Sequence, residues 1–71
     1  MARKIGLGHY LRDARIARGL SAAEVAERAG VSTACVYFWE SARNRPRDAN
    51  LVALCKALRL PIRATRELAA R

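Results

Sequence analysis

The segment best suited to chemistry is arginine-rich and covers residues 42–47, ARNRPR. Its three arginines and one asparagine can clamp phosphate oxygens, because a guanidinium donates two parallel hydrogen bonds to one phosphate. The segment directly follows a predicted helix that carries Tyr37 and Phe38 on its outward face. Exposed aromatic side chains indicate contact with a partner. The alternatives are a solvated loop and aromatic rings that fold back over a small core.

The whole chain is strongly basic. Fourteen Lys and Arg residues against six Asp and Glu give a net charge of +8 and a pI near 11.1. Twelve of the fourteen cations are arginine, which favours bidentate phosphate contact. A domain with this charge is expected to meet a polyanion, and nucleic acid is the commonest one. The alternative is a solvated basic surface on a helical domain.

No residues form a catalytic or metal-binding pattern in the sequence. Cys35 and Cys55 are isolated, without the spacing of metal ligands or redox motifs, and His9 has no catalytic partner. Paired carboxylates and a phosphate-cradling glycine loop are also missing from the sequence. We therefore expect a protein that is not an enzyme and that uses no cofactor or metal. The two cysteines are interpreted as small buried or half-buried thiols.

Targeting signals are also absent from the sequence. No apolar run approaches the length of a membrane span. The first ten residues, MARKIGLGHY, carry two cations but no apolar stretch behind them, so no signal peptide is predicted. The expected location is the cytoplasm, with no membrane partner.

Two short helices are predicted to position the arginines and aromatics. Residues 21–24, SAAE, form a capping box, in which the Ser21 hydroxyl and the Glu24 carboxylate each accept a backbone N–H. Gly30 ends this helix, and so short a turn makes the next helix cross it steeply. Ser32 then caps a helix over about residues 33–41.

The residues on the outward face of that helix can be inferred from those that face the core. Val36 and Trp39 lie three residues apart and face the core. The side chains left facing outward are Thr33, Ala34, Tyr37 and Phe38.

The start of the chain is predicted to be an arm followed by a helix. Gly6 and Gly8 should break any early helix, which leaves residues 1–8 as a basic N-terminal arm. The first helix is expected over about residues 9–18, and Gly19 closes it.

The end of the chain is predicted to supply the largest apolar stripe. A fourth helix over about residues 48–58 carries it at Leu51, Leu54, Cys55 and Leu58. A fifth helix over about residues 61–69 begins at Pro61, which suits a first helical turn. Residues 9–71 are therefore expected to form a single domain.

The stretch LRDARIARGLSAAEVAERAGVSTACVYFWESARNRP resembles the helix-turn-helix domain of the phage repressor and Cro superfamily, also called XRE-like. The resemblance covers about residues 11–62, and it rests on Arg15, on VAERAGVS and on Trp39-Glu40 taken jointly. It implies an all-α, compact five-helix lambda-repressor-like DNA-binding domain. The third helix would enter the major groove of operator DNA.

The resemblance also implies roles for individual residues. The base-facing positions are Thr33, Ala34, Tyr37 and Phe38. The phosphate-contacting group is Ser32, Arg43, Asn44, Arg45, Arg47, Arg12 and Arg18. Arg15 and Glu40 occupy the positions of an internal ion pair.

Three departures from the family pattern bear on these roles. Ala22 replaces a glutamine that often holds a phosphate, so that contact should be absent or come from a backbone amide. Ala42 replaces a favoured glycine, and we expect Asn44 rather than Ala42 to adopt the left-handed backbone conformation. The base-facing residues include no Gln, Arg or Lys, so direct base readout should be modest and shape readout larger.

The implied function is a sequence-specific transcriptional regulator, with repression as its expected mode. It would bind double-stranded DNA as a homodimer and associate with the nucleoid when bound. The alternative is a protein-interaction module, or an antitoxin-like protein, that binds a protein partner through the same helical surface.

Overall fold

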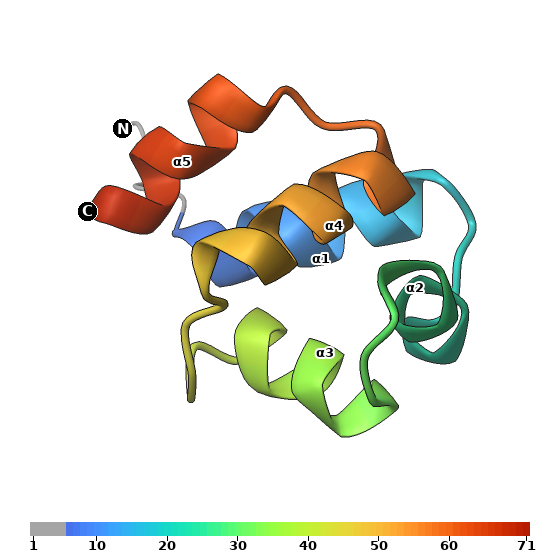
Figure 1. The fold of residues 1–71 in the computed structure, drawn as a ribbon. Coiled ribbons are helices and arrows are strands. Elements are labelled where there is room, and N and C mark those ends of the chain that lie inside the picture. Colours follow the sequence, from blue (N-terminus) through green and yellow to red (C-terminus); the bar gives the residue numbers. More distant parts are fainter. Residues whose placement is uncertain (1–5) are drawn as a thin grey trace, which may run out of the picture.

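The computed structural model describes residues 6–71, which form five α-helices and no strand (Figure 1). The helices are α1 (Leu7–Ala17), α2 (Ala22–Ala29), α3 (Thr33–Glu40), α4 (Asp48–Leu58) and α5 (Ile62–Ala70). In Figure 1, α1 and α4 lie centrally, with α3 below them, α5 above them and α2 at one end. The prediction of an all-α, five-helix domain is confirmed.

The helix ends match the predicted caps. The Ser21 hydroxyl accepts from the Glu24 amide at 3.0 Å, and the Glu24 carboxylate accepts from the Ser21 amide at 2.9 Å. These bonds lower the pKa of Glu24, so the stability they add is present at neutral pH and is lost on acidification. Gly30 ends α2 with φ of 72°, and the Ser32 hydroxyl accepts from the Cys35 amide at 3.2 Å.

The core forms where α2, α3 and α4 meet α1. Its buried members come from all four helices: Leu11, Ala14, Ala22, Val25, Ala26, Val36, Trp39, Leu54 and Leu58. The predicted stripe of α4 is buried throughout. Ala26 is small and buried within α2, and its carbonyl accepts from the Val31 amide at 3.0 Å. The core thus holds α3 against the rest of the domain by its inward face.

The prediction that Gly8 breaks the first helix is wrong. Helix α1 begins at Leu7, Gly6 is its N-cap, and Gly8 is buried inside the first turn. A Cβ atom on Gly8 would lie 2.5 Å from the Glu40 carbonyl oxygen and 2.8 Å from that of Trp39. Gly8 is therefore needed for the close approach of α1 to the end of α3. Of the predicted arm, Arg3 and Lys4 lie outside the described residues.

The expected left-handed residue in the loop after α3 is also different. Ala42 has φ of +63°, and Asn44 is not among the residues with positive φ. The turn at Ala42 lets the Arg43 and Asn44 amides donate to the Phe38 carbonyl at 2.9 and 3.4 Å. These hydrogen bonds end α3 by satisfying a carbonyl of its last turn. They offset the strain of about 1–2 kcal/mol that alanine bears in this conformation.

Replacing Ala42 by glycine is expected to stabilise the fold by about 1 kcal/mol, because glycine adopts positive φ without a Cβ clash. Urea unfolding would measure the change. The matched control is Ser41→Gly, at φ of −88°, which should lower stability by about 0.5–1 kcal/mol. An Ala42→Gly variant no more stable than the parent would contradict the strain at Ala42.

Helix α5 begins at Ile62, one residue later than predicted, and Pro61 precedes it as the N-cap. Thr65 is fully buried on this helix, and its hydroxyl donates to the Pro61 carbonyl at 2.7 Å. An apolar periodicity does not mark this residue, so it was not predicted. None of the helices in residues 6–71 has the length and apolarity required to cross a membrane.

Candidate nucleic-acid interface

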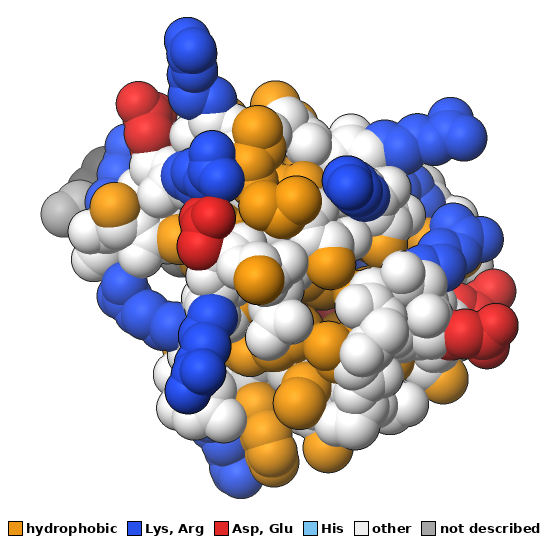
Figure 2. Space-filling model, viewed as in Figure 1, with side chains coloured by type: hydrophobic (Ala, Val, Ile, Leu, Met, Phe, Trp, Pro, Cys, Tyr) orange, Lys and Arg blue, Asp and Glu red, His pale blue; other side chains and the backbone are white. Residues whose placement is uncertain are grey.

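The outward face of α3 carries the four predicted side chains. Thr33 and Ala34 are exposed, and the exposed fractions of Tyr37 and Phe38 are 55% and 37%. Their neighbours Val36 and Trp39 are buried. The predicted division of the helix into two faces is confirmed, and Tyr37 does not fold back over the core. In Figure 2, hydrophobic side chains gather along the lower edge, where α3 lies.

The loop after α3 presents free cationic side chains. Arg43, Asn44 and Arg47 are exposed, and within residues 6–71 their side chains form no hydrogen bond or ion pair. The hydrogen bond from the Arg43 amide to the Phe38 carbonyl fixes the start of this loop beside the helix end. Ser32 is exposed at the other end of α3, where its oxygen accepts a hydrogen bond and its O–H can donate one.

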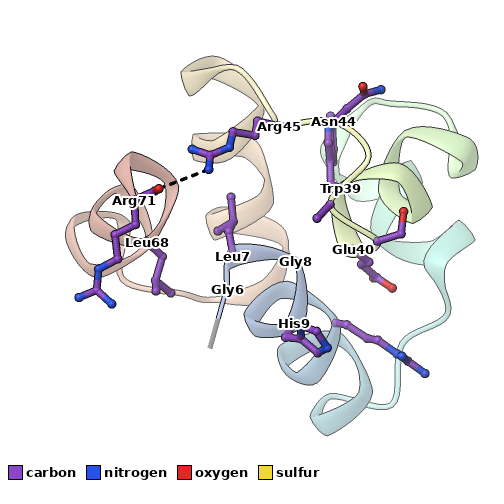
Figure 3. A pocket seen from close by; sticks show the side chains of 13 residues that line it. Gly6, Leu7, Gly8, His9, Trp39, Glu40, Asn44, Arg45, Leu68 and Arg71 are labelled. Atoms are coloured by element: carbon purple, nitrogen blue, oxygen red, sulfur yellow. Dashed lines mark hydrogen bonds between the residues drawn. The ribbon is translucent and has the colours of Figure 1, made fainter. Parts of the chain in front are cut away.

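Arg45 is placed differently from the predicted phosphate contact. Its Nη1 donates to the Ala69 carbonyl at 2.7 Å. Its Nη2 donates to the Arg71 carbonyl at 3.4 Å, the hydrogen bond drawn in Figure 3. A guanidinium at this position satisfies carbonyls and complements the negative end of the helix dipole. Arg45 thus ties the loop to the end of α5. It spans one side of a cavity of about 460 Å³ lined also by Leu7, Trp39 and Leu68.

Arg12 and Arg18, both predicted to contact phosphates, lie at different places along α1. Arg12 is exposed and shares a depression of about 280 Å³ with Tyr37 and Ser41, so it lies next to α3. Arg18 donates to the Ala14 carbonyl at 3.0 Å and to the Arg59 carbonyl at 3.5 Å, at the far end of α1. Six residues along a helix correspond to about 9 Å and about 240° of rotation. The structure therefore places Arg12 next to α3 and Arg18 at the opposite end of α1.

The predicted ion pair between Arg15 and Glu40 is confirmed. Nε of Arg15 donates to Oε2 of Glu40 at 2.7 Å, and Nη2 donates to Oε1 at 3.1 Å. The remaining Nη1 donates to the Leu20 carbonyl at 3.0 Å. The side chains are only 15% and 7% exposed, and the hydrogen bond to Glu40 raises the pKa of Arg15. This bidentate pair joins α1 to α3.

Replacing Glu40 by alanine is expected to destabilise the fold by about 2–3 kcal/mol, because the Arg15 guanidinium is then left without its charged acceptor. A double-mutant cycle of Glu40→Ala and Arg15→Met, followed by urea unfolding, would measure the coupling. The double variant should lose less than the two single losses combined. Glu40→Gln, which keeps one acceptor oxygen, should fall between parent and alanine. Strictly additive losses would contradict the pairing.

The sequence did not predict one further ion pair, between Arg66 and Asp48. Arg66 holds Asp48 by two hydrogen bonds of 2.9 Å, which lower the pKa of Asp48. Local spacing carries no signal for a pair so far apart in the chain.

Ala22 is 2% exposed and belongs to the core. Its side chain therefore offers nothing to a phosphate, and only backbone amides remain at the start of α2.

The arrangement can hold a polyanion beside a projecting helix, and within residues 6–71 it offers no metal-binding group of His, Cys, Asp or Glu. A family model described as a helix-turn-helix domain matches residues 6–69. The chain belongs to this helix-turn-helix family. In this domain α2 and α3, joined at Gly30 to Ser32, are the two helices of the motif.

A solved structure supports the same assignment. The fold is similar to that of the P22 c2 repressor, whose crystal structure is a complex with synthetic operator 9T in the presence of Tl⁺. The TM-score is 0.83 at 27% sequence identity, over 87% of this chain and 94% of that chain. No curated protein matches the sequence. The predicted resemblance to phage repressor-like domains is therefore confirmed.

Proposed function

We propose that this helix-turn-helix protein is a sequence-specific transcriptional repressor that binds operator DNA as a homodimer. The observation that carries the proposal is the exposed face of α3, followed at once by the free arginines of the loop. Membership of the helix-turn-helix family and the similarity to an operator-bound repressor support a DNA-binding regulator. The net charge of +8 supports the same partner.

In the proposed complex α3 lies in the major groove. Thr33 and Tyr37 can hydrogen-bond to base edges, whereas Ala34 and Phe38 can only pack, for example on thymine methyl groups. Arg43, Arg47 and Arg12 neutralise phosphates beside the helix, with Ser32 and Asn44 as polar contacts. Because base-reading groups are few, the sequence dependence of DNA shape supplies much of the specificity.

The proposed dimer places its two α3 helices in successive major grooves, about 34 Å apart. Repression follows from occupancy, since a dimer on a promoter excludes polymerase. Pull-down of genomic DNA fragments with the purified protein, followed by sequencing, would test this. We expect an enriched motif with two-fold symmetry and half-site centres about 10 base pairs apart.

The control for this experiment is Tyr37→Ala with Phe38→Ala, which should abolish the motif while the loop still retains DNA nonspecifically. A motif without symmetry would contradict the homodimer. Absence of any enriched motif would contradict sequence-specific binding and would favour the protein-interaction alternative.

A further inference from the structure

A groove lies along the seam between α4 and α5. In Figure 1, α5 lies on the opposite side of α4 from α3. Its central depression has a volume of about 440 Å³. The floor is apolar and consists of Val52, Cys55, Leu60 and Ile62. A further depression of about 330 Å³ continues past Arg66 between Leu51 and Ala69. Arg66 lines both depressions and is paired across the seam with Asp48, so the apolar surface consists of two adjoining patches along α4, which has 11 residues.

Cations surround this apolar floor. Lys56, Arg59 and Arg66 line the central depression, and Figure 2 shows Lys and Arg side chains on either side of the hydrophobic patch. Within residues 6–71, Arg66 is paired with Asp48, but neither Lys56 nor Arg59 forms an ion pair. Arg59 also lines the adjoining depression with Arg18 and Arg28. The groove thus combines an apolar floor with positive charges that have no acidic partner within residues 6–71.

This charge selects among possible occupants. A second copy of the chain, packed by a two-fold axis through the groove, would bring Lys56 and Arg59 against the same cations of its partner. Like charges opposed in this way disfavour the contact. A nucleic-acid backbone would satisfy the cations but would leave the floor of Val52 and Ile62 unused. An occupant must supply both apolar side chains and carboxylates.

We propose that the α4–α5 groove docks an acidic amphipathic segment of another protein. Its apolar side chains cover the floor at Val52 and Ile62, where burial of apolar surface supplies the binding energy. Its carboxylates accept charge-assisted hydrogen bonds from Lys56 and Arg59. A helical segment with apolar residues at every third or fourth position fits a seam of about 16 Å, the length of α4. This contact is separate from the proposed DNA interface.

The test uses a phage-displayed library of random peptides of about 16 residues, long enough to form a helix of about 24 Å. The purified full chain is the target, without DNA. We expect enriched peptides to combine Asp or Glu with Leu, Ile or Phe at helical spacing. Fluorescence anisotropy of one enriched synthetic peptide then measures affinity for the parent and for Val52→Glu and Lys56→Glu. Each substitution should weaken binding about tenfold or more, the equivalent of about 1.4 kcal/mol.

Matched controls separate the groove from the overall charge. Ile16→Glu makes the same change at a side chain that is 55% exposed on α1, and Arg63→Glu reverses one charge on α5 outside the groove. Both should bind the peptide as the parent does, and circular dichroism confirms that all variants fold.

Three results would overturn the proposal: no enriched peptide, enriched peptides without acidic residues, or equal loss in the groove and control variants. Sedimentation that shows a dimer of the parent dissociated by Val52→Glu would assign the groove to a second copy instead. Because no DNA is present, none of these results depends on the proposed regulatory function.

Discussion

Replacement of Arg43 and Arg47 together by glutamine is expected to weaken DNA binding by about 10³-fold at 0.1 M salt. Both side chains are exposed in the loop after α3 and are free of intramolecular partners within residues 6–71. The proposed dimer, with about 6–10 phosphate contacts, would lose about 10³–10⁵ in affinity between 50 and 200 mM salt. Removal of four such contacts should reduce the slope of log K against log salt by about 3.6.

The matched control is Arg18→Gln with Arg45→Gln, which removes the same charge from two arginines held by backbone carbonyls. Its salt slope should stay close to that of the parent, and its main effect should be lower stability of the helix ends. Fluorescence anisotropy with an operator duplex at several salt concentrations would measure the affinity and the salt slope of both double variants. Equal slope losses in the two pairs would show that only total charge matters. A nearly flat salt response in the parent would favour the protein-interaction alternative.

Replacement of Gly8 by alanine is expected to destabilise the fold by about 3 kcal/mol. Alanine normally favours a helix interior over glycine by about 1 kcal/mol. Here the new Cβ would lie 2.5 Å from the Glu40 carbonyl oxygen, which belongs to backbone and cannot turn aside. Overpacking of this kind costs about 1–3 kcal/mol, occasionally more. A chain of this size has a total stability of only about 4–11 kcal/mol, so the loss is a large part of it.

Urea unfolding followed by the fluorescence of the buried Trp39 would measure this loss. Gly6→Ala is the control, because no atom lies within 4 Å of the position of its Cβ. It should cost only the difference between glycine and alanine at an N-cap, about 1 kcal/mol or less. A Gly8→Ala variant as stable as the parent would contradict the close approach of α1 to the end of α3.

The helix boundaries around the motif were predictable because their causes are local. The Ser21 hydroxyl and the Glu24 carboxylate act within one turn, and Ser32 caps α3 over the same distance. The inward face of α3 follows from the spacing of Val36 and Trp39 alone. Family resemblance added the Arg15–Glu40 pair, which joins residues 25 positions apart and has no local signal.

The sequence did not predict which arginine side chains remain free and which are hydrogen-bonded to backbone carbonyls. Arg43 and Arg45 are two positions apart in one basic loop, and composition treats them alike. In the folded chain the end of α5 accepts two hydrogen bonds from Arg45, while Arg43 remains exposed. Arg18 is likewise drawn to carbonyls at the ends of α1 and α4. Which cations remain free depends on where distant helix ends lie.

By itself, the sequence determined that residues 6–71 contain five helices, that α3 has one buried and one exposed face, and that the chain carries a strong positive charge, which favours an anionic partner. These follow from capping, periodicity and net charge, which act within a few residues or do not depend on arrangement. Only the tertiary structure decided that Gly8 is a contact rather than a helix breaker, and that Ala42 bears the left-handed turn. It also separated the arginines that can reach a partner from those held by carbonyls. For Gly8 and Arg45 the physical reason is a carbonyl oxygen of a residue brought close only by folding. At Ala42 the reason is the hydrogen bonding of the next two amides to the Phe38 carbonyl.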